Sequence, residues 1–303
     1  MSKHLVVGAG PVGSTTARLL AERGEEVVVV TRTAATAHPL DGVRRLHLDA
    51  ADADALGAAA QGAAAIYNCA NPPYHRWAEV WPPLAASLLT AAERTGAVLA
   101  TVSNLYGYGA VDGPMTPQTP LRPNSVKGGV RAAMWREALA AHEAGRVRAT
   151  EVRGSDHLGP GVAGVLDGRA LGRALAGRTV QVLGDPDAPH SWTAPADTAR
   201  LLVTAAADER AWGRAWHVPS NPPRSQRQVV TDLCGAAGRP APKVTAIPRP
   251  VLALLGLASP TVRAVRETAY QFERPFVIDD TATREVFGLA PLAWERILAE
   301  LVP

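Results

Sequence analysis

Cysteine and lysine are both scarce in this chain of 303 residues. The two cysteines, Cys69 and Cys234, are too few for a disulfide framework or a cysteine-based metal pattern. The 31 basic residues include only Lys3, Lys127 and Lys243 as lysines, and the arginines are scattered rather than grouped into a stripe that could follow phosphates. The sequence therefore predicts no nucleic-acid partner and favours a reducing, intracellular setting.

Long apolar runs are also absent. The best, around Val251–Ala258, is far shorter than the roughly 18 residues that a membrane span needs. The short run Lys3–Val7 ends at Gly8, before the core of a signal peptide could form. We therefore expect a cytoplasmic protein with no membrane partner.

Apolar residues make up 47% of the chain, and 31 basic side chains nearly balance 28 acidic ones, which excludes an intrinsically disordered protein. In the first half, short apolar runs alternate with alanine- and leucine-rich segments. This alternation predicts βαβ units and therefore an α/β fold with a doubly wound parallel sheet. The expected strands are His4–Val7, Glu26–Thr31 (buried on both faces), Val43–Leu48, Ala64–Asn68 and Val98–Val102, and the expected helices are Ser14–Arg23 with Gly24 as its cap, Ala51–Ala60 and Ala78–Arg94.

After about residue 155 this pattern loosens, because proline and glycine become frequent. Helices are still expected at Thr198–Ala207 and Gln226–Ala236. We interpret residues 1–155 as the sheet domain and residues 156–303 as mainly a smaller lobe, interleaved with the edge of the sheet.

The segment GAGPVG at residues 8–13 is a G-x-G-x-x-G motif between the first strand and the first helix. Gly8 allows a tight turn, Gly10 lets backbone approach a pyrophosphate, and Gly13 lets the helix pack closely on the strand. The helix N-terminus adds N–H groups and the positive end of its dipole. The motif alone is a weak signal, but its position favours a dinucleotide-binding turn in which Gly8, Gly10, Pro11, Val12 and Gly13 contact the cofactor.

The second strand ends in Thr31-Arg32-Thr33. A carboxylate there would select NAD through the ribose hydroxyls, whereas a guanidinium and hydroxyls suit a 2′-phosphate. We therefore favour NADP (NADPH) over NAD, with Thr31 and Arg32 in the cofactor site; the alternative is that Arg32 is an ordinary surface arginine. Asp49, after the third strand, either accepts a hydrogen bond from the adenine amino group or caps the helix that begins near Ala51.

Together these elements resemble the short-chain dehydrogenase/reductase superfamily, specifically its extended or atypical branch of NAD-dependent epimerase/dehydratase-like proteins. The resemblance covers nearly the whole chain. It implies a Rossmann-type cofactor domain in residues 1–155, a substrate lobe after it, Ala70 and Asn71 at the cofactor, and a homodimer through helices Ala78–Arg94 and Lys127–Ala144. The segments that carry it are Gly8–Gly13, Asn68–Asn71, Ser103–Gly107, Lys127, Val152–Gly161 and His190–Asp197.

The catalytic pair of that family is Tyr-x-x-x-Lys on one helix face. The tyrosine exchanges a proton with the substrate oxygen, and the lysine holds the nicotinamide ribose and lowers the pKa of the tyrosine. Here the matching segment is Pro123–Lys127, so the resemblance gives Lys127 the ribose but puts a proline, which has no proton to give, at the tyrosine position. Tyr106 and Tyr108, after the fifth strand, are the candidate replacements, and Tyr106 is favoured. The alternatives are that Tyr106 packs at the domain junction and that Lys127 is a surface residue.

The substrate side also departs from the family. Sugar-nucleotide members carry an asparagine near the substrate diphosphate, where this chain has Asp156 followed by His157. A carboxylate facing a diphosphate is repulsive unless it is protonated or salt-bridged, so Asp156 favours a neutral or cationic small molecule, unless it only caps a turn. Tyr74, Trp77 and Trp192 are expected to line the pocket, which suits an apolar or aromatic substrate.

The sequence thus predicts an NADP-dependent oxidoreductase that acts on a small-molecule carbonyl or imine by hydride transfer, with Tyr106 or Tyr108 as proton donor. The alternatives are an epimerase or dehydratase with resident NAD(P), and a non-catalytic protein that senses the dinucleotide. Because His75, His157 and His190 have no i, i+4 partner or carboxylate cluster beside them, we predict no metal site.

Overall fold

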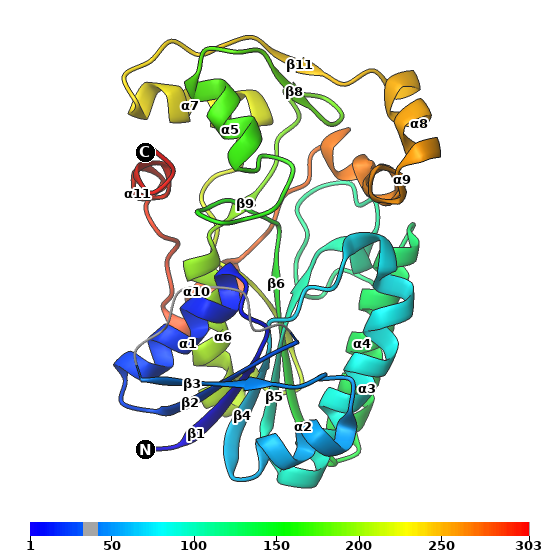
Figure 1. The fold of residues 1–303 in the computed structure, drawn as a ribbon, viewed down its shortest axis with the longest axis vertical. Coiled ribbons are helices and arrows are strands. Elements are labelled where there is room, and N and C mark those ends of the chain that lie inside the picture. The colour runs from blue at the N-terminus through cyan, green and yellow to red at the C-terminus, as the bar shows by residue number, and fades with distance from the viewer. Residues whose placement is uncertain (33–41, 303) are drawn as a thin grey trace.

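The computed structural model describes residues 1–32 and 42–302; Thr33, named above at the end of the second strand, lies outside them. Within these residues the central sheet has seven strands in the spatial order β10-β6-β5-β4-β1-β2-β3, and every pairing is parallel (Figure 1). The predicted doubly wound parallel sheet is therefore confirmed. The strands are β1 (Lys3–Val7), β2 (Glu26–Thr31), β3 (Val43–His47), β4 (Ala63–Asn68), β5 (Val98–Asn104), β6 (Arg148–Gly154) and β10 (Ala215–His217).

Helices cover both faces of this sheet. Helices α2, α3 and α4 lie on one face, and α1, α6 and α10 lie on the other (Figure 1). Their bounds are α1 (Pro11–Glu22), α2 (Ala53–Ala60), α3 (Trp77–Thr95), α4 (Val126–Glu143), α6 (Pro195–Ala207) and α10 (Thr281–Phe287).

Strand β2 shows why its sequence lacks polar alternation. Its four consecutive valines are all buried. Successive side chains of a strand point to opposite faces, so Val28 and Val30 pack in the core under α2 and α3, while Val27 and Val29 pack in the core under α1 and α6. The expected burial on both faces is confirmed.

Among the helix starts that differ from the prediction, those of α1 and α2 have local reasons. Helix α1 begins earlier than expected, at Pro11, because proline is favoured at the first helical position, where its missing N–H is not needed. Helix α2 begins later than expected, at Ala53, because the carboxylate of Asp52 accepts two backbone N–H bonds of its first turn. At the end of α1, Gly24 adopts a left-handed φ of +76°, as its position predicted.

The second half of the chain builds a lobe with its own apolar core, which includes Leu171, Val230, Leu233 and Trp294. Strand β10 and helices α6 and α10 come from the same half of the chain but join the sheet domain.

The longest apolar run of the sequence forms the lobe helix α8, and within residues 1–32 and 42–302 no helix has the length and apolarity to cross a membrane. The lobe contains β7 (Asp156–His157), α5 (Gly168–Leu175), β8 (Val180–Val182), β9 (Trp192–Thr193), α7 (Gln226–Ala236), β11 (Val244–Ala246), α8 (Arg249–Ala258), α9 (Pro260–Glu267) and α11 (Trp294–Ala299).

Candidate functional site

A cavity of about 300 Å³ lies at the carboxyl ends of β1, β4, β5 and β6. Its walls come from the turn before α1, the loops after β4, β5 and β6, and the 3₁₀ turn Ala269–Phe272 of the lobe. Strands β2 and β3 lie on one side of β1, and the next strands in the sequence, β4 to β6, lie on its other side, so the strand order reverses between β1 and β4. Doubly wound sheets bind their ligands at such a switch point, so this cavity is the candidate site.

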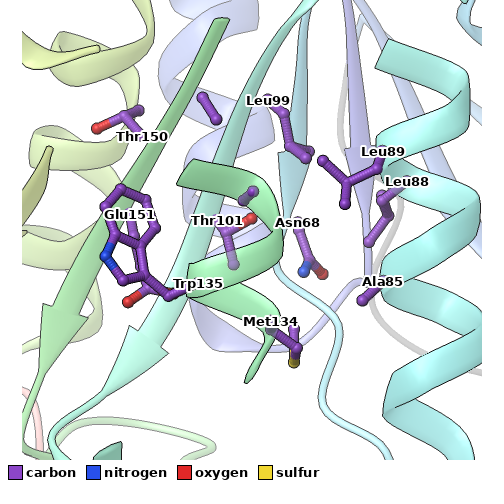
Figure 2. A pocket seen from close by; sticks show the side chains of 12 residues that line it. Asn68, Ala85, Leu88, Leu89, Leu99, Thr101, Met134, Trp135, Thr150 and Glu151 are labelled. Carbon is purple, nitrogen blue, oxygen red and sulfur yellow. The ribbon is translucent and has the colours of Figure 1, made fainter. Parts of the chain in front are cut away.

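A second, much smaller gap of about 20 Å³ lies inside the sheet domain, against helices α3 and α4 (Figure 2). It is lined by apolar side chains such as Leu88, Leu99 and Met134, and by Glu151. The carboxylate of Glu151 already accepts a 2.6 Å hydrogen bond from Arg153 Nε. Because this volume holds about one water molecule, the gap is no ligand site.

The glycine turn has the geometry that its motif predicts. Gly8 has a φ of +105°, and a Cβ there would lie 2.6 Å from the carbonyl oxygen of Cys69. A Cβ on Gly13 would lie 2.0 Å from the carbonyl oxygen of Gly8. Gly10, by contrast, has open space where a Cβ would lie, and it caps the start of α1. The first N–H groups of this helix lack helical partners, so they are suited to binding the pyrophosphate of a dinucleotide. The predicted cofactor residues that line the cavity are Gly10, Pro11, Val12, Ala70 and Asn71.

Three other predicted cofactor residues, Thr31, Arg32 and Asp49, lie beyond the cavity, near the carboxyl ends of β2 and β3. Thr31 ends β2, and the exposed Arg32 follows it. Asp49 does not cap α2, because Asp52 does so. The carboxylate of Asp49 instead accepts a local 3.1 Å hydrogen bond from the N–H of Ala51.

Tyr106 lies in the cavity wall, directly after β5. Its hydroxyl accepts a 3.0 Å hydrogen bond from Tyr74 Oη and a 3.5 Å bond from Gln271 Nε2. Because both partners donate, the hydrogen of Tyr106 is left for an acceptor in the cavity. Burial, followed by the nearby carboxylate of Asp156, raises the pKa of Tyr106 well above its ordinary value. Tyr106 is therefore a neutral phenol and a hydrogen-bond donor.

Tyr108 does not reach the cavity, so we do not retain it as an alternative proton donor. Its side chain is 1% exposed; its hydroxyl accepts a 2.6 Å hydrogen bond from Arg153 Nη1 and lies 2.7 Å from Nε2 of His217. Burial lowers the pKa of His217 to about 4, which keeps that ring neutral at neutral pH. The 3₁₀ turn sends the side chains of Tyr106 and Tyr108 in different directions, whereas an extended strand would send them the same way.

Lys127 is buried but does not line the cavity. Its Nζ donates a 2.6 Å hydrogen bond to one carboxylate oxygen of Glu267, and its backbone N–H donates a 2.9 Å bond to the other. Helix α4 begins at Val126 with Ser125 as its cap, so Pro123 precedes the helix and shares no helical face with Lys127. The structure therefore does not support matching Pro123 and Lys127 to the tyrosine and lysine of the family pair.

Arg131, one helical turn after Lys127, is a cation that does line the cavity. Its Cζ lies 4.6 Å and 4.2 Å from the ring centroids of Trp77 and Trp81, and its Nη1 donates a 3.3 Å bond to the carbonyl of Val102. Burial lowers the pKa of Arg131 to about 10, so it stays charged at neutral pH. Its buried Nε has no hydrogen-bond partner within the described chain. Sequence reasoning missed this residue, although the four-residue spacing from Lys127 was visible.

The predicted substrate residues divide into two groups. Trp192 does not line the cavity: it is buried in the lobe core, and its ring packs 4.8 Å from that of His190. Asp156 does line it, with Oδ2 only 3.0 Å from Nε2 of His190. The carboxylate is therefore partnered, and the electrostatic argument against a nucleotide sugar loses its premise of an unpaired charge. The predicted residues that line the cavity are Tyr74, Trp77, Asp156 and His157.

His157 is a neutral part of the cavity wall. Burial lowers its pKa to about 4, and its Nε2 lies 3.0 Å from the hydroxyl of Thr198. Within the part of the chain that the structure describes, no three histidine, cysteine, aspartate or glutamate side chains gather in a way that could hold a metal ion.

Comparisons with known proteins agree with this architecture. A family model described as "NAD dependent epimerase/dehydratase family" matches residues 4–218, and no curated protein sequence matches the chain. The structure of dTDP-glucose 4,6-dehydratase from Bacillus anthracis in complex with NAD has a TM-score of 0.80 at 18% identity, covering 99% of this chain and 95% of that one. UDP-glucose 4-epimerase from Thermotoga maritima with UDP-glucose has a TM-score of 0.81 at 18% identity, covering 99% and 97%. At such identities the likeness shows a shared fold.

Replacing Tyr108 by phenylalanine should lower the free energy of unfolding by about 1–3 kcal/mol, because Arg153 and His217 then lose a buried partner. Chemical denaturation measures this loss, and titration with a nicotinamide dinucleotide should give the wild-type affinity. Tyr270→Phe is the matched control, since the hydroxyl of Tyr270 is buried without a partner in the described chain and its removal should cost little. A Tyr108→Phe variant that is fully stable but binds the cofactor poorly would contradict this assignment.

Proposed function

The chain belongs to the NAD-dependent epimerase/dehydratase family, and we propose that it is an enzyme that transfers hydride between a nicotinamide dinucleotide and a small molecule. The observation that carries this proposal is the hydroxyl of Tyr106, hydrogen-bonded to Tyr74 and Gln271, in the wall of a cavity bounded by the glycine turn. A bound nicotinamide supplies the hydride donor or acceptor at its C4. The protein then has to hold the substrate oxygen.

Tyr106 and Arg131 are the residues suited to that task. Tyr106 donates its hydrogen bond to the substrate oxygen and, when a carbonyl is reduced, its proton. The hydroxyls of Tyr74 and Thr268, 2.9 Å apart, continue the hydrogen-bonded chain behind Tyr106. The fixed charge of Arg131 stabilises negative charge that develops on the substrate oxygen. Arginine carries this charge without acting as a proton carrier.

Two catalytic cycles use such a site. The first is an epimerase or dehydratase cycle, in which a bound cofactor would be regenerated within each turnover, and family membership favours this cycle. In the second, a carbonyl or imine is reduced with net consumption of cofactor. The raised pKa of Tyr106 keeps the phenol protonated, and this second cycle needs a protonated group to act as the proton donor.

For the cofactor we propose NADP, although similar solved structures contain NAD. The support is local: Thr31 and Arg32 follow the carboxyl end of β2, where a guanidinium can pair with a 2′-phosphate. From the family resemblance we also propose a homodimer through helices α3 and α4.

Replacing Tyr106 by phenylalanine should lower turnover about 10²- to 10⁴-fold while cofactor affinity is retained, because only the donor hydroxyl is lost.

To find a substrate for this test, we would screen dTDP-glucose, UDP-glucose and a panel of small aldehydes and ketones, following nicotinamide absorbance and product formation together. Product without net change in absorbance identifies the resident-cofactor cycle. Unchanged turnover in Tyr106→Phe would remove Tyr106 from the mechanism. Cofactor binding with no turnover of any compound would favour a dinucleotide sensor.

Replacing Arg131 by methionine should lower kcat/KM at least about 100-fold, because the cavity loses its fixed charge, and Arg131→Lys should recover part of that loss. Lys127→Met is the comparison: it should mainly lower stability, since the ammonium of Lys127 meets Glu267 rather than the cavity. Steady-state kinetics and thermal denaturation of the three variants separate the two effects. A larger kinetic loss in Lys127→Met than in Arg131→Met would restore Lys127 to the lysine role of the family pair.

Replacing Arg32 by glutamate should weaken NADPH binding at least tenfold, or ~1.4 kcal/mol, because an attractive charge becomes a repulsive one. The affinity for NADH, which lacks the 2′-phosphate, should stay close to that of the wild type. Fluorescence titration of both cofactors with both proteins makes the test. Equal or tighter NADPH binding by the variant would show that Arg32 is a surface residue.

A further inference from the structure

The carboxylate of Asp156 is divided between the protein and the cavity. Strand β7 carries Asp156 beside β9, and one oxygen, Oδ2, meets His190 at 3.0 Å. No residue of the described chain donates a hydrogen bond to the other oxygen, Oδ1. The side chain is 15% exposed and lines the cavity. Asp156 therefore presents one free acceptor to a ligand.

His190 holds this carboxylate in place. Its ring is 1% exposed and is stacked on Phe272 at 4.7 Å and on Phe276 at 5.3 Å, with interplanar angles of 17° and 19°. Its Nδ1 lies 3.3 Å from the carbonyl oxygen of Gln271, and its Nε2 lies 3.3 Å from Oγ of Ser155 as well as 3.0 Å from Oδ2 of Asp156. Two stacked aromatic rings fix the plane of the imidazole, and its Nδ1 lies against a backbone carbonyl. The ring therefore keeps its Nε2 directed toward Asp156.

Among the described side chains that line the cavity, Asp156 is the only carboxylate, and the amide oxygen of Gln271 is a second buried acceptor without a partner. Tyr106 is a neutral donor, and His157 is neutral because burial lowers its pKa to about 4. Arg131 is a cation stacked on two tryptophans. An ionised carboxylate can only accept a hydrogen bond, whereas an amide in its place could also donate one.

We propose that Asp156, positioned by His190, selects a substrate that places a hydrogen-bond donor, an ammonium or hydroxyl group, at this wall over one that places only acceptor oxygens against Oδ1. The inference rests on the proposed function, because it takes the cavity as the substrate site. A substrate whose reacting oxygen binds to Tyr106 is then oriented by its donor group at Asp156.

Three probes with one ring and different charges test this proposal: trans-4-aminocyclohexanol, cyclohexane-1,4-diol and 4-hydroxycyclohexanecarboxylate. Their binding to the enzyme saturated with NADP⁺ is measured by calorimetry, so turnover is not needed. The amine should bind at least about tenfold more tightly than the carboxylate, with the diol between them. A carboxylate that binds as tightly as the amine, or the absence of binding by amine and diol, would overturn the proposal.

The variant Asp156→Asn keeps the size of the side chain and adds a donor, so the amine and carboxylate probes should bind it within about threefold of each other. In His190→Leu the same ratio should fall while the NADP⁺ affinity stays unchanged, as expected for a positioning residue. Asp187→Asn, in an exposed ion pair with Arg227, is the control and should keep the wild-type order. An unchanged order in Asp156→Asn would overturn the proposal. Failure of the enzyme to bind any dinucleotide would instead overturn the proposed function.

Discussion

The structure depends on a close backbone approach at the carboxyl end of β1. Gly8 packs against the carbonyl of Cys69 after β4, and Gly13 packs against the carbonyl of Gly8, at distances that exclude any Cβ. This contact fixes the direction in which α1 leaves the sheet, and it brings Gly10 to the edge of the cavity. Burial raises the pKa of Cys69 to about 12, so its thiol stays protonated and serves as a small packing group behind the turn. Cofactor binding and the packing of the first βαβ unit therefore rely on the same atoms.

The buried charges fall into two kinds, and this difference identifies Arg131. Arg153 is paired with Glu151, and Lys127 is paired with Glu267, so each of these cations has a partner carboxylate within the fold. Arg131 makes no ion pair with any residue of the described chain; it lies instead against Trp77 and Trp81. A buried cation without a counterion is costly, and proteins retain such groups chiefly at functional sites. Lys127 has the residue type that the family pattern expects. Arg131, however, is the cation that lines the cavity, and its buried Nε has no hydrogen-bond partner in the described chain.

The fold was predictable because its signals are local, whereas much of the site depends on contacts between distant segments. The valines of β2 and the glycines at residues 8–13 each specify a conformation within a few residues. Tyr106 and Tyr108 look equivalent in the sequence, and only the 3₁₀ turn separates their directions. The start of α4 at Val126 decides that Lys127 and Arg131, rather than Pro123 and Lys127, share a helix. Ser125, a favourable cap residue, was the available signal for that start. No local pattern indicates that His190 reaches Asp156.

The departures from the family pattern are consistent with one another in chemical terms. On α4 a lysine and an arginine occupy the spacing of the tyrosine and lysine, which removes the phenol from the helix and leaves a fixed cation. The carboxyl end of β5 and helix α4 border the same cavity. A phenol can therefore come from the turn after β5 instead of from the helix. Tyr106 then lacks a proton-carrying lysine, and its pKa is raised rather than lowered. In a site of this kind Tyr106 is a protonated phenol, and in the proposed function Arg131 stabilises negative charge on the substrate oxygen. Asp156 adds an acceptor within reach of the same ligand, so donor, cation and acceptor together define how a substrate must lie.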